Sequence, residues 1–173
     1  DLDRRRFEEF KNFTNKIWNG SRFVMMNLDL TAEELSEGIV TSLLTLEDKW
    51  IFSRLNQVII AINTHLNAYH FDRAAMESYT FFWDEFCAYY VEMVKPVLFG
   101  KVGNAHLRKN KQKILVTILS NALRLMHPIA PFVTEEIFQL LKENFPSLKP
   151  ANKDPYTNET IKAFLSKACT VAP

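Results

Sequence analysis

Residues 10–28 read FKNFTNKIWNGSRFVMMNL, and this stretch decides the fold class. In a helix that turns about 100° per residue, the stretch divides into a polar stripe and an apolar face. The polar stripe holds Lys11, Asn12, Asn15, Asn19, Arg22 and Met26, and the apolar face holds Phe10, Phe13, Ile17, Val24 and Leu28. We therefore predict an amphipathic helix, from about Leu2 to Asn27, that buries one side in a core.

Capping signals and helical spacing divide the rest of the chain into further helices. A short helix is predicted after Thr31, which forms a capping box with Glu34, and Gly38 limits it. Asp72 is the predicted cap of the third long helix, which Pro96 ends. The long helices after the first are predicted over residues 45–69, 72–96, 114–127 and 133–145, followed by a loop over 146–158 and a short helix over 159–168.

These elements predict an all-α fold. Only 4 Gly and 7 Pro in 173 residues favour long elements with few tight turns. Because each amphipathic helix must bury its apolar face against neighbours, we expect an antiparallel bundle of four to five long helices with short extra helices. The bundle is expected over residues 1–145, and the loop and short helix over 146–173 lead toward a missing C-terminal region.

Charge and cysteine content exclude several classes of function. The formal net charge is +1, so any basic footprint for nucleic acid must be local. Cys87 and Cys169 lie far apart, which indicates neither a zinc ribbon nor a disulfide framework and suits a reducing cytosol. The sequence contains no secretory signal and no apolar run that could cross a bilayer. It begins at Asp1 without Met, as an excised piece of a longer protein would.

The sequence offers no catalytic or metal centre. None of its His residues follows a Glu by three positions, as the iron sites of helix bundles require. Gly100 and Gly103 lack the Gly-Lys-Ser/Thr ending of a phosphate-binding loop and are expected to form a plain turn. Cys87 follows Phe86 in an aromatic helix, so we expect a packed thiol and not a nucleophile.

The polar stripe can bind a partner or can be an ordinary solvated helix face. A stripe of amides with one guanidinium and few carboxylates suits base edges and phosphates. Asn12, Asn15 and Asn19 are also poor helix formers for an exposed position, which indicates some other demand on them. Trp18 lies beside the stripe and can stack on an unpaired base or pack at the edge of the core.

Two further segments have the same two interpretations. The basic stretch over residues 101–113 holds no acid and can attract phosphates or form a solvated loop and helix start. The aromatic residues of the third long helix can stack on bases or fill the core. They are Trp83, Phe86, Tyr89 and Tyr90. Arg124 and His127, near a helix end, are expected to complement the dipole of that helix.

Four blocks of sequence point to a known family. They are residues 13–23 (FTNKIWNGSRF), 48–55 (DKWIFSRL), 82–87 (FWDEFC) and 125–137 (LMHPIAPFVTEEI). In this order they resemble the anticodon-binding helical domain of class I aminoacyl-tRNA synthetases, up to about Phe145. Within that family, Asn-Lys-Ile-Trp-Asn followed by Ser-Arg-Phe resembles the valyl branch more than the leucyl or isoleucyl branch.

The resemblance implies an RNA-binding module without chemistry of its own. In that family a separate catalytic domain uses ATP, with magnesium, to join the amino acid to its tRNA. Its signatures, His-x-Gly-His and Lys-Met-Ser-Lys-Ser, are absent from this sequence. By resemblance, the anticodon stem-loop of a tRNA is contacted by Asn15, Lys16, Asn19 and Arg22. The candidate secondary RNA contacts are Lys11, Asn12, Trp83, Lys101, Arg108 and Lys109.

The resemblance also implies a cytoplasmic setting in protein synthesis. The catalytic domain of the same polypeptide is then a second partner, and a membrane is not. The piece itself is expected to be a monomer that holds no cofactor or metal. Two alternatives stay open: the same module from a leucyl or isoleucyl synthetase, and a helical protein-interaction bundle whose polar stripe meets a partner helix instead of RNA.

Overall fold

A computed structural model describes residues 4–145, which form helices and no strand. The long helices are α1 (Arg4–Met26), α3 (Leu46–Asn67), the continuous run of α4 (Phe71–Thr80), η2 (Phe81–Tyr90) and α5 (Val91–Leu98), then α6 (Ala105–Met126) and α7 (Pro131–Asn144). Between α1 and α3 lie α2 (Ala32–Ser36) and the 3-10 turn η1 (Thr41–Leu43). The predicted all-α bundle is confirmed. The predicted loop over 146–158 and helix over 159–168 lie outside the described residues.

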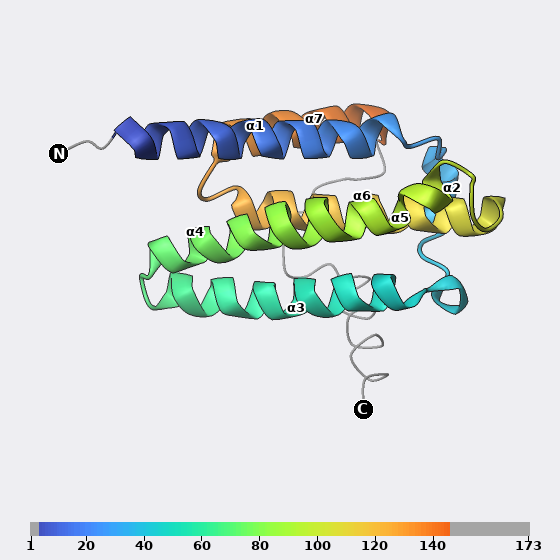
Figure 1. The fold of residues 1–173 in the computed structure, drawn as a ribbon, viewed down its shortest axis with the longest axis horizontal. Helices are drawn as coiled ribbons and strands as arrows, with labels where there is room; N and C mark the ends of the chain where they lie inside the picture. The colour runs from blue at the N-terminus through green and yellow to red at the C-terminus, as the bar shows by residue number, and fades with distance from the viewer. Residues whose placement is uncertain (1–3, 146–173) are drawn as a thin grey trace.

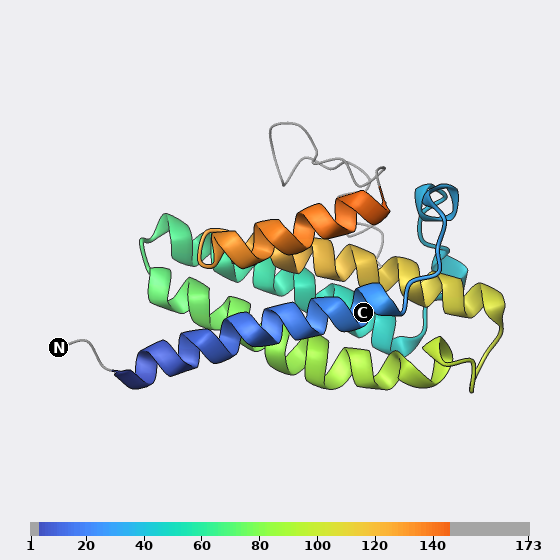
Figure 2. The ribbon, with the colours of Figure 1, turned by 90° about the horizontal axis from the view of Figure 1, so that it is seen from above.

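The long helices stack in layers (Figure 1). α1 and α7 lie side by side in one layer, α6 and the α4–η2–α5 run form the next, and α3 packs beneath them. Helices that follow one another along the chain, such as α3 and α4 or α6 and α7, run antiparallel. Seen from above, α1 passes over η2 while α7 covers α6 (Figure 2). This arrangement leaves the outer side of α1 at the surface.

The apolar face of α1 enters the core largely as predicted. Phe13, Ile17 and Val24 are buried, and Leu28 is half-buried. The prediction for Phe10 was wrong, because this side chain is 61% exposed. Phe10 belongs to the N-terminal end of α1, which extends beyond the neighbouring helices and so lacks a surface to pack against (Figures 1 and 2).

The predicted capping box of Thr31 with Glu34 is confirmed, and the structure shows a second one, of Thr45 with Asp48, at the start of α3. The start of the third long helix differs slightly from the prediction. Tyr69 adopts a φ of 58° and reverses the chain after α3, so His70 becomes the cap and Asp72 lies in the first turn of α4. A carboxylate in that turn still complements the helix dipole.

Pro96 does not end its helix, contrary to the prediction, and α5 continues to Leu98. Proline disturbs the turn that precedes it, while its own carbonyl stays available as an acceptor. That carbonyl accepts the backbone N–H of Lys101 at 2.8 Å and that of Val102 at 3.2 Å. The chain therefore turns after Pro96, and the next helix follows closely.

The starts of α6 and α7 also lie earlier than predicted. Asn104 caps α6 by accepting the N–H of Leu107 at 2.9 Å, so most of the basic stretch is helical. α7 begins at Pro131 rather than at Val133, since proline suits the first position of a helix. The acids Glu135 and Glu136 consequently lie beyond the first turn of α7.

η2 is a wide π-helical segment, where a regular α-helix was predicted. The rings of Phe82 and Phe86 lie 5.7 Å apart, and those of Phe86 and Tyr90 lie 6.3 Å apart. All three are buried. The wider turn of a π-helix brings residues four and five apart over one another, and here it lines up these rings in the core.

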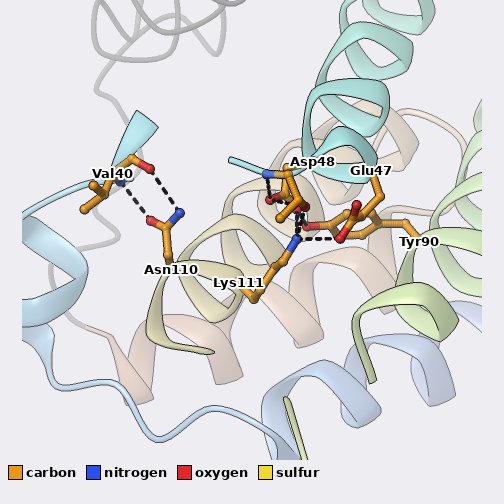
Figure 3. Close-up of polar contacts among 7 residues, drawn as sticks. Val40, Glu47, Asp48, Tyr90, Asn110 and Lys111 are labelled. Carbon is orange, nitrogen blue, oxygen red and sulfur yellow. Dashed lines mark hydrogen bonds and ion pairs between the residues drawn. The ribbon is translucent and has the colours of Figure 1, made fainter. Parts of the chain in front are cut away.

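A buried ion pair joins α6 to α3 and η2 (Figure 3). The Nζ of Lys111 donates to Asp48 Oδ1 at 2.7 Å and to Glu47 Oε1 at 2.9 Å, and it also contacts the Thr45 hydroxyl. Tyr90 donates its hydroxyl to the same Asp48 oxygen at 2.7 Å. Burial, reinforced by Asp48, holds the pKa of Tyr90 well above its usual value, so the phenol remains a donor. Every charge in this cluster thus has partners.

Replacing Lys111 with Met tests how much the bundle depends on this cluster. The change leaves the Asp48 carboxylate buried without its cation, so we expect urea unfolding to show a loss of about 3–5 kcal/mol. Lys113 is the matched control. Its Nζ lies 3.2 Å from Glu37 Oε2, but the Glu37 side chain is largely exposed to solvent. Lys113→Met should cost no more than about 1 kcal/mol. Equal losses in the two variants would contradict the role given to Lys111.

Candidate nucleic-acid interface

All six residues of the polar stripe are exposed on the outer side of α1, as predicted. Asn15, Asn19 and Arg22 have no hydrogen-bond or ion-pair partner among the described residues. Their donors and acceptors are therefore available to a ligand. Met26 ends the stripe and is 73% exposed.

Lys16 lies at the edge of the stripe and contacts a pair of stacked aromatic rings. Its Nζ lies 3.9 Å from the ring centroid of Trp83 in η2, a distance typical of a cation–π interaction. The Trp83 ring in turn stacks on Tyr79 of α4, with centroids 5.4 Å apart and an angle of 13° between the planes. Tyr79 also contacts Phe13 of α1, at 5.0 Å between centroids. This stack orients the one ammonium that borders the stripe.

Lys16 and Trp83, both candidate RNA contacts, therefore touch each other in the structure. The half-buried Trp83 has two partners already, so a base that stacked on it would have to share the ring with Tyr79 and Lys16. Sequence inspection missed Tyr79, although its spacing of four residues from Trp83 is the usual spacing for a ring contact along a helix.

Gly20 allows α1 and η2 to approach closely. A β-carbon at this position would lie 2.7 Å from Cys87 Sγ and 3.3 Å from Phe82 Cζ. The thiol itself is packed, as predicted: burial raises the pKa of Cys87 to about 12, and the nearby Lys16 ammonium opposes this only in part. Cys87 is therefore protonated at neutral pH and fills space beside Gly20.

The basic stretch is neither a solvated loop nor an unpaired cluster of charge. Arg108 Nη2 lies 3.0 Å from Asp29 Oδ2, and Lys109 pairs with Glu34. The contact with Lys109 lowers the pKa of the Glu34 carboxyl. Lys111 and Lys113 pair with acids as described above. Lys101 alone among these cations is exposed without an acidic partner in the described part of the chain.

The amides of the same stretch hold the connection between α1 and α3. The side chain of Asn110 accepts the N–H of Val40 at 2.8 Å and donates to its carbonyl at 3.1 Å (Figure 3). Gln112 accepts the N–H of Asp29 at 3.2 Å. The start of α6 is therefore a structural anchor, whose partners are remote in the sequence.

The remaining predicted residues divide between core and surface. Phe86 and Tyr90 are buried, whereas Trp18 and Tyr89 are exposed. Arg124 lies in the last turn of α6 with its guanidinium 5.8 Å from the centre of the Phe138 ring, and burial lowers its pKa. At the elbow between α6 and α7, His127 Nδ1 lies 3.0 Å from Thr134 Oγ1. These contacts join the last two helices.

The described residues contain no cluster of three or more His, Cys, Asp or Glu side chains that could hold a metal ion. None of the described helices has both the length and the apolar character needed to cross a membrane.

Comparison with known proteins identifies the family. Residues 48–171 match the family described as the anticodon-binding domain of tRNA ligase, and the chain belongs to that family. Its relatives include valine–tRNA ligases. That of Protochlamydia amoebophila is 59% identical over all of this chain, and those of Chlamydia trachomatis serovar L2 and Chlamydia felis are 43% and 42% identical over 99% and 100% of it. The chain covers only 18–19% of the length of these relatives.

The predicted resemblance is thus confirmed, and these relatives belong to its valyl branch. The structure explains why the four blocks are distinctive. Besides the stripe, they supply contacts between helices, such as the two hydrogen bonds of 2.7 and 2.9 Å between Arg54 of α3 and Glu85 of η2. The blocks therefore specify the scaffold as well as the exposed face.

The substitution Gly20→Ala tests the close contact between α1 and η2. Inside an ordinary exposed helix this change stabilises a protein by up to about 1 kcal/mol. Here we expect urea unfolding to show a loss of about 1–3 kcal/mol, because the methyl group overlaps Cys87. The double variant with Cys87→Ala should recover part of that loss, with Cys87→Ala alone as its control. Stabilisation by Gly20→Ala would refute the close contact.

Proposed function

We propose that this chain binds the anticodon stem-loop of a tRNA through the polar stripe of α1, as the RNA-binding part of a valine–tRNA ligase. The observation that carries the proposal is the exposed row of Asn15, Asn19 and Arg22, whose polar groups have no partner among the described residues. Membership of the anticodon-binding family supports the same ligand. The proposal names Asn15, Lys16, Asn19 and Arg22 as the principal contacts.

Each principal contact has a chemical role in this proposal. The amides of Asn15 and Asn19 each offer a donor beside an acceptor, which matches the edge of an unpaired base. The planar guanidinium of Arg22 can bind a phosphate or a guanine edge with two hydrogen bonds. Lys16 contributes a point charge that its contact with Trp83 keeps beside the stripe.

Secondary contacts would extend the same face. Lys11 and Asn12 continue the stripe toward the N-terminus of α1, and Lys101 is an exposed cation. Arg108 and Lys109 enter the proposal as cations that RNA must share with Asp29 and Glu34. We therefore expect these two to contribute less than Arg22.

The proposed division of labour places catalysis outside this chain. A complete valine–tRNA ligase would join valine to its tRNA with ATP and magnesium in the cytoplasm, through a catalytic domain of the same polypeptide. The present chain would act as a monomer that holds the RNA and needs neither cofactor nor metal. The low sequence coverage of the relatives is compatible with this division.

Titration with the anticodon stem-loop of a valine tRNA, at several salt concentrations, tests the proposal. We expect submillimolar affinity that falls as salt rises. Arg22→Ala should weaken binding by about 1–3 kcal/mol and make the salt dependence shallower, since one cation is lost. Asn19→Ala should weaken binding with the salt dependence unchanged.

Matched controls lie at the α3–α4 turn, on another part of the bundle. Asn67 and Arg73 are exposed there, and their replacement by Ala should leave affinity unchanged. Equal affinity for unrelated hairpins, together with no effect of Asn19→Ala or Arg22→Ala, would refute specific recognition. Such a result would favour the protein-interaction bundle instead.

The absence of catalysis is tested by pyrophosphate exchange with valine, ATP and magnesium. We expect the 173-residue chain to give no exchange above background, because its sequence lacks both catalytic signatures. A complete valine–tRNA ligase serves as the positive control. Exchange by the chain alone would show that it carries an active site.

A further inference from the structure

Tyr69 adopts a backbone conformation that tyrosine rarely takes. It follows the C-cap of α3 with a φ of 58°, and it is the one residue other than glycine with a positive φ in the described part of the chain. Its N–H donates to the carbonyl of Leu66 at 3.0 Å. The next N–H along the chain donates to the carbonyl of His65 at 2.8 Å, which completes a Schellman motif. Glycine is the usual residue at this position, because a β-carbon strains the left-handed backbone.

The Tyr69 side chain contributes little to the core of the bundle. It is 80% exposed, and its ring meets that of Phe71, which is 61% exposed. The two centroids lie 6.2 Å apart, with an angle of 81° between the planes. Two large rings thus stand in solvent at a turn where glycine would relax the backbone. A departure from local preference of this kind indicates that the residue serves a contact outside the fold.

The surface beside these two rings carries no full charge. Residues 55–71 hold no Asp, Glu, Lys or Arg, and no run without these residues is longer in the sequence. Within this run, the exposed side chains of α3 are spaced by three and four residues and so lie on one side of the helix: Gln57, Ile60, Thr64 and Asn67. Depletion of charge beside exposed aromatic residues is typical of the centre of a protein interface.

This surface does not suit RNA. Binding of RNA depends on cations that neutralise phosphates, and residues 55–73 offer one Arg, Arg73, directly beside Asp72. The surface also lies on α3, in the layer opposite the polar stripe of α1 (Figure 1). A protein partner fits it better, because aromatic residues and Arg are the side chains that most often anchor protein interfaces.

The start of α4 adds a polar group to this surface. His70 is the N-cap residue, but its side chain makes no capping hydrogen bond, so the first turn of α4 lacks a side-chain acceptor. Arg73 in that turn is exposed and has no acidic partner among the described residues. The surface therefore suits a protein face with an apolar centre and a carboxylate at its edge, which Arg73 would pair.

The proposed function supplies such a partner. It places a catalytic domain in the same polypeptide, and the chain covers only 18–19% of the length of its relatives. The N-terminal end of α1 and the turn between α3 and α4 lie at the same end of the bundle (Figures 1 and 2). In a complete ligase, a domain joined to the bundle at the start of α1 would therefore lie within reach of Tyr69 and Phe71.

We propose that the turn between α3 and α4, together with the uncharged side of α3, is the surface on which the catalytic part of the same polypeptide docks, with Tyr69 and Phe71 as its anchors. The inference rests on the proposed function, since it requires a complete valine–tRNA ligase. It adds a contact that holds the bundle at one angle to the catalytic part. RNA bound on α1 would then meet the active site in one orientation.

The test compares one substitution in two proteins, the 173-residue chain and a complete valine–tRNA ligase that contains it. In the chain alone, Tyr69→Gly should raise the melting temperature by about 2–4 °C, because glycine suits the left-handed backbone. Affinity for the anticodon stem-loop should stay unchanged.

In the complete ligase the same substitution removes an anchor of the docked domain. We therefore expect kcat/KM for aminoacylation of valine tRNA to fall about tenfold. The first thermal unfolding transition of the ligase should move to lower temperature, opposite in sign to the shift in the chain alone. Pyrophosphate exchange with valine and ATP, measured without tRNA, should stay unchanged.

Conservative and distant variants serve as controls. Tyr69→Phe keeps the ring and should behave as the unchanged ligase in every assay. Phe71→Ser should reproduce the loss of aminoacylation seen with Tyr69→Gly. Tyr89 on η2 is similarly exposed, at 60%, and Tyr89→Ala should leave aminoacylation unchanged.

Three outcomes would contradict the proposal. If Tyr69→Gly and Phe71→Ser leave both aminoacylation and unfolding of the complete ligase unchanged, no domain docks on this surface. If they weaken stem-loop binding by the chain alone, the surface contacts RNA. If the chain alone is a dimer that these substitutions dissociate, a second copy occupies the surface. A lack of effect of Arg22→Ala on RNA binding would instead refute the proposed function, and the unfolding of the ligase would still report the contact.

Discussion

The Lys111 ammonium is fully buried and must find its carboxylates inside the bundle. Because an unpaired charge there would cost several kcal/mol, α3 can start only where Asp48 and Glu47 meet α6. This constraint fixes where the connection after α1 must arrive. The same turns of α6 then hold that connection through Asn110 and Gln112. The end of α1, and with it the polar stripe, is thus positioned from α6.

Local sequence patterns predicted the helices well, because the residues that determine where a helix forms and begins lie within a few positions of one another. The split of α1 follows from helical spacing, and the two capping boxes depend on residues three apart. The basic stretch could not be interpreted in this way. Lys111 and Asp48 are 63 positions apart, and Lys109 and Glu34 are 75 apart, so no window of sequence contains both partners. A run of cations without nearby acids therefore resembles a phosphate site even when it is an anchor.

In the candidate interface, too, the features set within one helix were predictable and those set by contacts between helices were not. The exposed stripe was predictable, since one helix contains it. Its surroundings were not, because the aromatic stack behind Lys16 comes from α4 and η2. The π-helical turn that lines up the rings is also set by tertiary packing, because nothing in residues 81–90 departs from an ordinary helical pattern.

The tight fit at Gly20 has a mechanical consequence for the stripe. With Cys87 and Phe82 against its backbone, α1 cannot rotate about its own axis without opening the contact to η2. The direction in which Asn15, Asn19 and Arg22 point from α1 is therefore fixed relative to η2. A pull on these side chains from outside would therefore reach η2 through the contact at Gly20 as well as through the contact of Lys16 with Trp83.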